Sequence, residues 1–173
     1  MKKIIICATL LLALLPPISS AAEKIFLGDL KPMKAKVGFG GYYVITNGDC
    51  GTAEAKEFLV NGKPAQRGLF THADSEIVFA IPQGARKFVA VGTMPNFQRA
   101  SRGDFLDGSW SYEVIIDGVQ VYESQPLCAY VKKQIPIEVD IPESAKQITL
   151  KTHMLGDANT DHSIWAEPYF IKP

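Results

Sequence analysis

Apolar and polar residues alternate with a period of two along much of the chain, which is the pattern of β-strands with one buried face. The longest run covers residues 135–141, where isoleucine or valine occupies every second position. Shorter runs cover residues 76–81, 111–116 and 147–151. No long segment has apolar residues at helical spacing, so the pattern predicts an all-β fold.

Turn signals separate these runs. Asp117–Gly118 lies between two apolar segments and predicts a β-hairpin with a type I′ turn, and Asn61–Gly62 predicts a second hairpin. Pro136 lacks a backbone donor, which places its strand at a sheet edge or at a bulge. Short strands joined by turns indicate an antiparallel β-sandwich rather than a parallel sheet with crossover helices.

The N-terminus has the features of a secretory signal peptide. Lys2 and Lys3 precede an apolar stretch, residues 4–15, which is too short to span a membrane, and small residues follow at 19–22. We therefore expect a signal peptide over residues 1–22 and one domain over residues 23–173. The mature protein is predicted to be secreted or periplasmic, without a membrane anchor.

Charge and cysteine content narrow the classes of partner. The chain has 18 basic and 18 acidic side chains, and loss of Lys2 and Lys3 leaves a balance near −2. This balance gives no electrostatic reason to expect binding to nucleic acid or to an anionic membrane. Cys50 and Cys128 remain after cleavage, and an oxidising compartment permits a disulfide between them, but sequence spacing leaves the pairing open.

A polar loop near the C-terminus, residues 156–161, leads into an aromatic final strand that contains His162 and Trp165. Sugar recognition needs an apolar surface for the C–H face of the ring and a few planar polar groups for its hydroxyls. The candidates for this role are His72, Asp74, Asp161, His162 and Trp165. The alternative for His72 is a buried, backbone-bonded imidazole, and for Trp165 it is a place in the core.

Calcium binding is a second candidate property, because hard cations take carboxylate and carbonyl oxygens from loops. The candidate ligands are Asp49, Thr52, Asp157, Asp161 and Glu167. Glu167 has an alternative role as a solvated charge at the end of a strand.

The sequence gives less support for a catalytic site than for a binding site. The sequence has no nucleophile elbow, no paired cysteines or histidines at zinc-ligand spacing, and no phosphate-binding loop. We therefore predict a protein that is not an enzyme, with a small hydrolase using Asp74, Asp161 and His162 as an alternative.

Several sequence blocks together resemble a known family. They are residues 26–30 (FLGDL), 35–40 (AKVGFG), 68–77 (GLFTHADSEI), 88–92 (FVAVG), 108–124 (with EVIIDGVQVYES), 148–150 (ITL) and 156–166 (with DHSIWA). Their order and spacing resemble the NPCBM-type domain, carbohydrate-binding module family 51, over about residues 25–171.

The resemblance implies a galactose-binding-like β-sandwich of jelly-roll type that binds galactose-containing glycans, often with a structural calcium ion. Matching positions carry the sugar-binding role to His72, Asp161, His162 and Trp165. Analogy with related modules assigns the calcium ion to Glu167 with Asp49 or Thr52. The resulting hypothesis is an exported, lectin-like module without catalytic activity. An exported protein-interaction module on the same fold is the first alternative.

Overall fold

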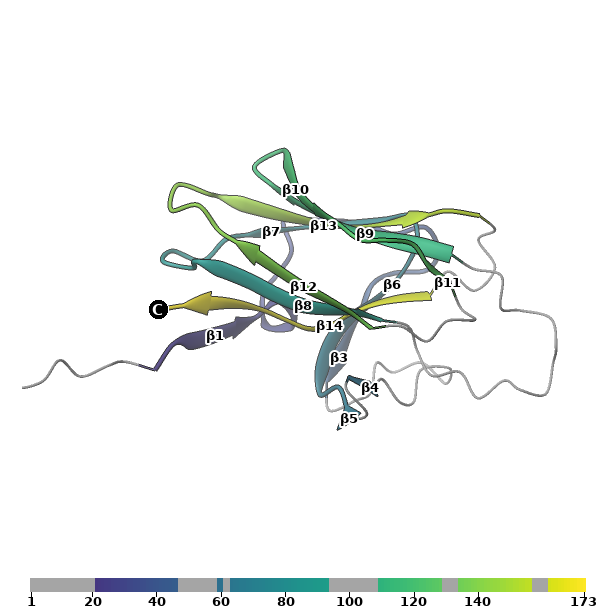
Figure 1. Cartoon of the computed structure of the whole chain (residues 1–173), viewed down its shortest axis with the longest axis horizontal. Helices are drawn as coiled ribbons and strands as arrows, with labels where there is room; N and C mark the ends of the chain where they lie inside the picture. Colours follow the sequence, from purple (N-terminus) through teal and green to yellow (C-terminus); the bar gives the residue numbers. More distant parts are fainter. Residues whose placement is uncertain (1–20, 47–58, 61–62, 94–108, 129–133, 157–161) are drawn as a thin grey trace, which may run out of the picture.

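The computed structural model describes residues 21–46, 59–60, 63–93, 109–128, 134–156 and 162–173. Its strands form two antiparallel sheets that lie face to face (Figure 1). The first sheet, sheet A, contains β12 (Ile135–Asp140), β8 (Lys87–Thr93), β14 (His162–Lys172), β6 (Arg67–His72) and β3 (Tyr43–Thr46) in that order, with β1 (Glu23–Phe26) also paired to β14. The all-β antiparallel sandwich predicted from the sequence is confirmed.

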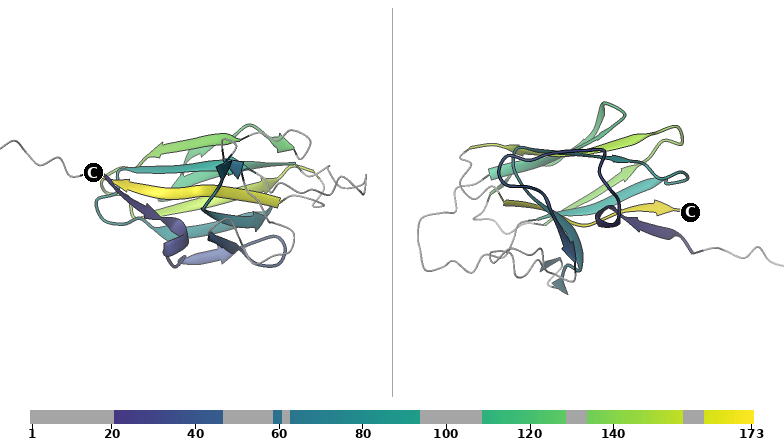
Figure 2. Two further views of the ribbon diagram at one scale, coloured as in Figure 1. Left: turned by 90° about the horizontal axis from the view of Figure 1, so that it is seen from below. Right: turned by 180° about the vertical axis from the view of Figure 1, so that it is seen from behind.

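The second sheet, sheet B, contains β10 (Val119–Glu123), β9 (Ser109–Ile116), β13 (Gln147–Met154), β7 (Ser75–Ala80) and β2 (Lys34–Lys36), with β11 (Leu127–Cys128) also paired to β9. A separate two-stranded hairpin joins β4 (Leu59–Val60) to β5 (Lys63–Pro64). A single turn of 3-10 helix, η1 (Leu27–Asp29), follows β1. Figure 2 shows the two layers from below and from behind.

The core lies between the sheets and is built by the inward residues of the alternating strands. Sheet A contributes Leu69, Phe88 and Trp165, and sheet B contributes Phe79 and Tyr112, each of them at most 1% exposed. Burial of a large apolar side chain contributes about 1.5–3 kcal/mol relative to its exposed state, so this layer dominates the stability of the fold. A smaller apolar cluster lies on the other face of sheet A and includes Ile45, Phe70 and Ile164.

The predicted hairpin at Asp117–Gly118 is confirmed as the connection from β9 to β10. Both turn residues have positive φ angles, 48° for Asp117 and 85° for Gly118, as a type I′ turn requires. The Asp117 carboxylate also accepts the backbone N–H groups of Lys146 and Gln147, which fixes this turn to the start of β13.

The prediction for Pro136 is also confirmed, because β12 forms an edge of sheet A. The turn at Asn61–Gly62 lies outside the described residues, although β4 and β5 on its two sides pair as a hairpin would require.

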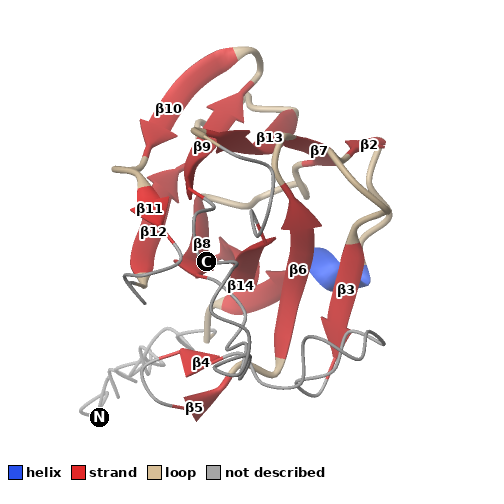
Figure 3. Cartoon of the chain, turned by 90° about the vertical axis from the view of Figure 1, so that its right-hand side faces the viewer, coloured by secondary structure: helices blue, strands red, loops and turns tan. Residues whose placement is uncertain are grey.

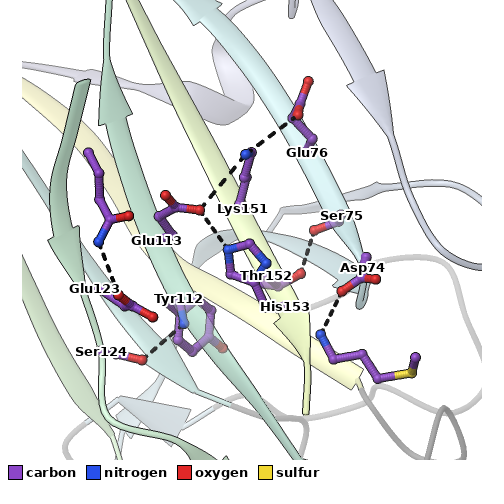
Figure 4. Close-up of polar contacts among 12 residues, drawn as sticks. Asp74, Ser75, Glu76, Tyr112, Glu113, Glu123, Ser124, Lys151, Thr152 and His153 are labelled. Atoms are coloured by element: carbon purple, nitrogen blue, oxygen red, sulfur yellow. Dashed lines mark hydrogen bonds and ion pairs between the residues drawn. The ribbon is translucent and has the colours of Figure 1, made fainter. Parts of the chain in front are cut away.

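One face of β9 differs from the expectation. The alternation assigned Ser111 and Glu113 to a solvent-exposed face, but they are only 3% and 7% exposed. Strands β10 and β13 flank β9, and the Glu113 carboxylate lies 2.6 Å from His153 Nε2 and 3.9 Å from Lys151 Nζ (Figure 4). Long neighbouring side chains thus cover a surface that a period-two pattern alone marks as open.

The charged network continues across sheet B. Glu76 accepts a hydrogen bond of 2.7 Å from Lys34, and this bond is the main reason that the pKa of Glu76 lies below its ordinary value. Lys151 lies between Glu76 and Glu113, at 3.9 Å from each (Figure 4). The outer face of sheet B is therefore tied together by alternating charges.

None of the helical segments in the described part of the chain has the length and apolar character that crossing a bilayer requires.

Candidate histidine–aromatic binding face

His72 and His162 lie side by side although they are far apart in the sequence. His72 ends β6 and His162 begins β14, and the two residues are direct cross-strand partners in the antiparallel pair. Their ring centroids are 4.2 Å apart, with an angle of 53° between the ring planes. Figure 3 shows β6 between β14 and β3. Both imidazoles therefore lie on neighbouring inner strands of sheet A, at the same end of those strands.

Two further aromatic rings contact the imidazoles, and a third contacts one of those two rings. Phe70 lies 5.5 Å from His162 and 5.6 Å from His72, and Tyr43 on β3 lies 5.8 Å from Phe70. Phe39 contacts His72 edge-on at 5.6 Å. We name Phe39, Tyr43, Phe70, His72 and His162 the histidine–aromatic face.

Exposure increases from the floor of this face to its rim. Phe70 is 3% exposed and belongs to the small apolar cluster, whereas Tyr43 is 36% and Phe39 is 76% exposed. Phe39 contacts His72 and Tyr43 contacts Phe70, so both exposed rings adjoin one surface. Contiguous exposed apolar surface commonly marks a binding site. The face therefore combines a fixed apolar floor, two imidazoles and an accessible phenyl ring.

Gly38 and Gly40 place Phe39 at the rim. A Cβ atom on Gly38 would lie 2.3 Å from the carbonyl oxygen of Ala73, so only glycine permits this close approach to the turn after His72. Gly40 has a φ angle of +70°, which L side chains rarely adopt. The two glycines bring the segment carrying Phe39 across the end of β6.

A chain of buried hydroxyl groups supports the face from the inner side of sheet A. The Oγ atoms of Thr71 and Ser163 are 2.7 Å apart, next to the imidazole pair in the same strand pairing. Ser75 bonds Thr71 at 3.1 Å and Thr152 at 2.5 Å, which extends the chain to β7 and β13 of sheet B. All four side chains are at most 4% exposed, so these bonds fix the strands that carry His72 and His162.

Asp74 has a structural contact at the same end. Its carboxylate accepts the backbone N–H of Met154 at 2.6 Å (Figure 4), which ties the β6–β7 turn to the end of β13.

Trp165 does not join this face, so its predicted role as a sugar platform is corrected. It is 0% exposed and packs between Tyr112, at 4.8 Å, and Phe88, at 6.4 Å. In a β-strand, residues three positions apart point to opposite faces. With His162 on the outer face of sheet A, Trp165 necessarily enters the core.

The predicted calcium ligands are described only at Glu167. Glu167 has a φ angle of 47° next to a register shift in β14, and its Oε1 accepts the backbone N–H groups of Gln66, at 2.7 Å, and Arg67, at 3.2 Å. The two amides orient a carboxylate, whose hard oxygen atoms suit calcium. Asp49 and Thr52 lie outside the described residues, as do Asp157 and Asp161.

Other predictions concern the same parts of the chain. Cys50 lies outside the described residues, so its disulfide with Cys128 stays a prediction. In the portion that the structure describes, no three or more His, Cys, Asp or Glu side chains gather as a metal site would require.

Sequence reasoning missed Phe39, Tyr43 and Phe70 as members of the face. Phe39 lies in the block AKVGFG, and a phenylalanine between glycines is a signal for an exposed aromatic group on a tight loop. Phe70 shares its strand face with His72 by alternation.

Comparison with known proteins places the whole β-sandwich in context. The model of the NPCBM/NEW2 domain family matches residues 23–171. A search of the curated proteins finds no significant match.

Solved structures of CBM51 modules have the same fold. A CBM51 module of Clostridium perfringens GH95 in complex with methyl-galactose is 23% identical, with a TM-score of 0.68 over 86% of this chain and 99% of that chain. The tandem CBM51 modules of the family 98 glycoside hydrolase from Streptococcus pneumoniae SP3-BS71 are 23% identical, with a TM-score of 0.73 over 88% of this chain and 48% of that chain.

A CBM51-2 structure of Clostridium perfringens ZmpB in complex with GlcNAc, which also contains INT domains, is 21% identical, with a TM-score of 0.71. The match covers 87% of this chain and 32% of that chain, so this chain spans about a third of the ZmpB structure. At these identities the likeness shows the fold.

Proposed function

The chain belongs to the NPCBM/NEW2 domain family, and from this premise we propose that it is an exported carbohydrate-binding module without catalytic activity. Galactose-type glycans are the proposed ligands, in line with the methyl-galactose bound by the similar GH95 module. Export follows from the predicted signal peptide over residues 1–22, which is the basis for a secreted or periplasmic location.

One observation carries the proposal: the cross-strand imidazole pair lies beside an exposed phenyl ring. The phenyl ring of Phe39 offers an apolar surface for the C–H face of a sugar, and the imidazoles of His72 and His162 offer planar polar groups for hydroxyls. Phe39 thus takes the role that the sequence assigned to Trp165. Asp161 precedes His162 directly and stays a proposed ligand residue.

Replacement of Phe39 by alanine is expected to weaken binding of methyl-galactoside by about 1–2 kcal/mol, because an exposed aromatic anchor is lost. The fold should be unaffected, since Phe39 is 76% exposed. Isothermal titration calorimetry on the wild type, Phe39→Ala and His72→Ala measures the effect, with a thermal melt of each variant.

Val119→Ala is the matched control, because Val119 is an apolar residue of sheet B that is 64% exposed. Unchanged affinity in both Phe39→Ala and His72→Ala would contradict the assignment of the site. A folded wild-type protein that binds no sugar on a glycan array would contradict carbohydrate binding itself and favour a protein partner.

We also propose that the module carries a structural calcium ion near Glu167, with Asp49 or Thr52 as the further ligands. The support is chemical: two backbone amides orient the Glu167 carboxylate, which limits the entropy that a bound cation would have to overcome. The ion would supply local rigidity rather than a reactive group.

Calcium at about 100 times its dissociation constant is expected to stabilise the fold by about 2.7 kcal/mol. Differential scanning fluorimetry should show a rise in Tm that EDTA reverses. Glu167→Gln keeps an oxygen acceptor for the two amides but removes the charge, so this variant should lose the calcium effect while it stays folded. An equal rise in Tm for Glu167→Gln would rule out Glu167 as a ligand.

A further inference from the structure

We propose that the outer face of sheet B is a self-association surface, through which two copies of the chain form a two-fold symmetric dimer. The histidine–aromatic face lies on the outer side of sheet A, on the opposite side of the sandwich. A dimer formed through sheet B leaves both histidine–aromatic faces free and pointing away from each other. The dimer does not rest on sugar binding, because other residues of the other sheet make its contacts.

A row of charged residues crosses the outer face of sheet B from strand to strand. Strand pairing places Lys36 of β2 beside Glu76 of β7. Glu76 is paired in turn with Lys151 of β13, and Lys151 is paired with Glu113 of β9. The last three of these residues each adjoin a core residue in their own strand, so alternation places the row on the outer face. The charges therefore alternate across four strands in the order positive, negative, positive, negative.

This order of charges is complementary to itself when a second copy is rotated by 180°. With a two-fold axis perpendicular to the sheet between β7 and β13, Glu76 of each copy faces Lys151 of the other. The same rotation brings Lys36 of each copy over the acidic end of the other row, at Glu113. A two-fold interface uses the same patch on both copies, so every favourable contact occurs twice. Complementary charges of this kind favour one orientation of the two copies over the others.

The face is flat, and charged side chains project from it. Val78 and Thr149, which lie in the next row, are each only 9% exposed. The side chains of Glu76 and Lys151 are 30% and 28% exposed, so both are accessible to a second copy. Sheets that pack face to face lie about 10 Å apart with their strands within about 30° of each other, and a copy rotated by 180° keeps its strands aligned in this way.

Ion pairs within one copy hold the row in place. Lys151 Nζ lies 3.9 Å from a carboxylate oxygen of Glu76 and 3.9 Å from one of Glu113 (Figure 4). On its other side, Glu76 lies 2.7 Å from Lys34 Nζ. Because these side chains are already ordered in the single copy, their immobilisation adds little to the entropic cost of association.

The size of the face determines how strong the dimer can be. Five strands follow one another across sheet B, and at a spacing of about 4.8 Å and a length of about 20 Å they cover roughly 500 Å² per copy. Two copies bury about 1,000 Å² in total, which is the lower end for a specific interface. We therefore expect an association that is weak, concentration-dependent and sensitive to salt.

Sedimentation velocity of the mature protein from about 10 µM to about 1 mM tests the dimer, because a weak interface is populated only at high concentration. The wild type should change from monomer to dimer over this range, and an ionic strength of about 1 M, with a Debye length of about 3 Å, should reverse the change. Glu76→Lys and Lys151→Glu each place like charges opposite each other at two equivalent positions beside the axis. Each should weaken dimerisation by at least about tenfold.

An equimolar mixture of Glu76→Lys and Lys151→Glu separates loss of the dimer from a folding defect. In the mixed dimer the new lysine of one variant faces the new glutamate of the other, and the native Lys151 faces the native Glu76. The mixture should therefore recover the dimer that each variant alone has lost, which misfolded proteins could not do. Lys87→Glu is the matched control, because it makes the same change of charge on β8 of sheet A, and it should dimerise as the wild type does.

A wild type that stays monomeric at the highest concentration would overturn the proposal. Variants at Glu76 and Lys151 that dimerise as strongly as the wild type would overturn it as well, because the two-fold axis would then lie elsewhere. A mixture that stays monomeric while the wild type dimerises would exclude the pairing of Glu76 with Lys151 across the axis.

Discussion

Replacement of Trp165 by alanine is expected to destabilise the protein by about 3–5 kcal/mol, the usual range for removal of a buried tryptophan. The indole is 0% exposed and has Tyr112 edge-on at 4.8 Å and Phe88 at 6.4 Å, so its loss leaves a cavity between the two sheets. Native proteins are stable by about 5–15 kcal/mol, so this change removes a large part of the total. Urea unfolding followed by circular dichroism measures it.

Trp165→Phe is the control, because it keeps a ring at the centre of the sandwich. The indole N–H has no acceptor within the described portion of the chain, so the smaller ring loses volume without losing a hydrogen bond that the structure records. We expect its cost to be well below that of alanine. A Trp165→Ala protein with an unchanged unfolding midpoint but no sugar binding would contradict the placement of Trp165 in the core and restore it as a binding residue.

The period-two pattern alone was enough to predict that Trp165 and His162 point to opposite faces of their strand. Once the final segment is recognised as a strand, the period of two places His162 and Trp165 on opposite faces. Membership of both residues in one binding surface was therefore inconsistent with the strand itself. Local rules of this kind also succeeded at Asp117–Gly118, where two adjacent residues contain the whole turn signal.

The contact between His72 and His162 has a different origin. It depends on the pairing and register of β6 with β14, which are distant in the sequence, and no local pattern encodes that register. The resemblance to the NPCBM-type domain named both histidines, but their direct contact became visible only in the structure. The same is true of Phe39, whose position depends on the approach of Gly38 to the Ala73 carbonyl.

A period-two pattern also could not predict which polar residues are buried. Thr71, Ser75, Thr152 and Ser163 are buried because they satisfy one another, and each alone would be expected at the surface. Glu113 is covered because Lys151 supplies a positive charge 3.9 Å from its carboxylate and His153 a hydrogen-bond contact at 2.6 Å. These contacts join residues of different strands, so the pattern within one strand does not reveal them.

Replacement of Tyr112 by phenylalanine is expected to cost about 1–3 kcal/mol at neutral pH, because it leaves buried backbone groups without their partner. The Tyr112 hydroxyl lies 2.6 Å from the Thr93 carbonyl and 3.0 Å from that of Ile164, and it accepts the Ile164 N–H at 3.2 Å. These bonds connect β9 of sheet B to β8 and β14 of sheet A. The ring fits against Gly92, where a Cβ atom would lie 2.6 Å away, so shape and hydrogen bonds act at the same place.

The cost of Tyr112→Phe should decrease at alkaline pH. Burial is the main reason that the pKa of Tyr112 lies far above its ordinary value. Above pH about 10 the unfolded chain releases the phenol proton while the folded protein retains it, so wild-type stability falls by up to about 1.4 kcal/mol per pH unit. Tyr112→Phe has no phenol proton at this position, so its stability does not fall with pH for this reason. The pKa of Tyr122 is also raised by burial, but that residue is common to both proteins and cancels in the difference.

Urea unfolding of the two proteins at pH 9 and pH 11 measures the difference. The gap between their free energies of unfolding should narrow by about 1 kcal/mol at the higher pH. A gap that stays constant would mean that the Tyr112 hydroxyl ionises equally easily in the folded and unfolded states. That result would be incompatible with a hydroxyl buried between the two sheets, directly behind the strands that carry His162 and Thr93.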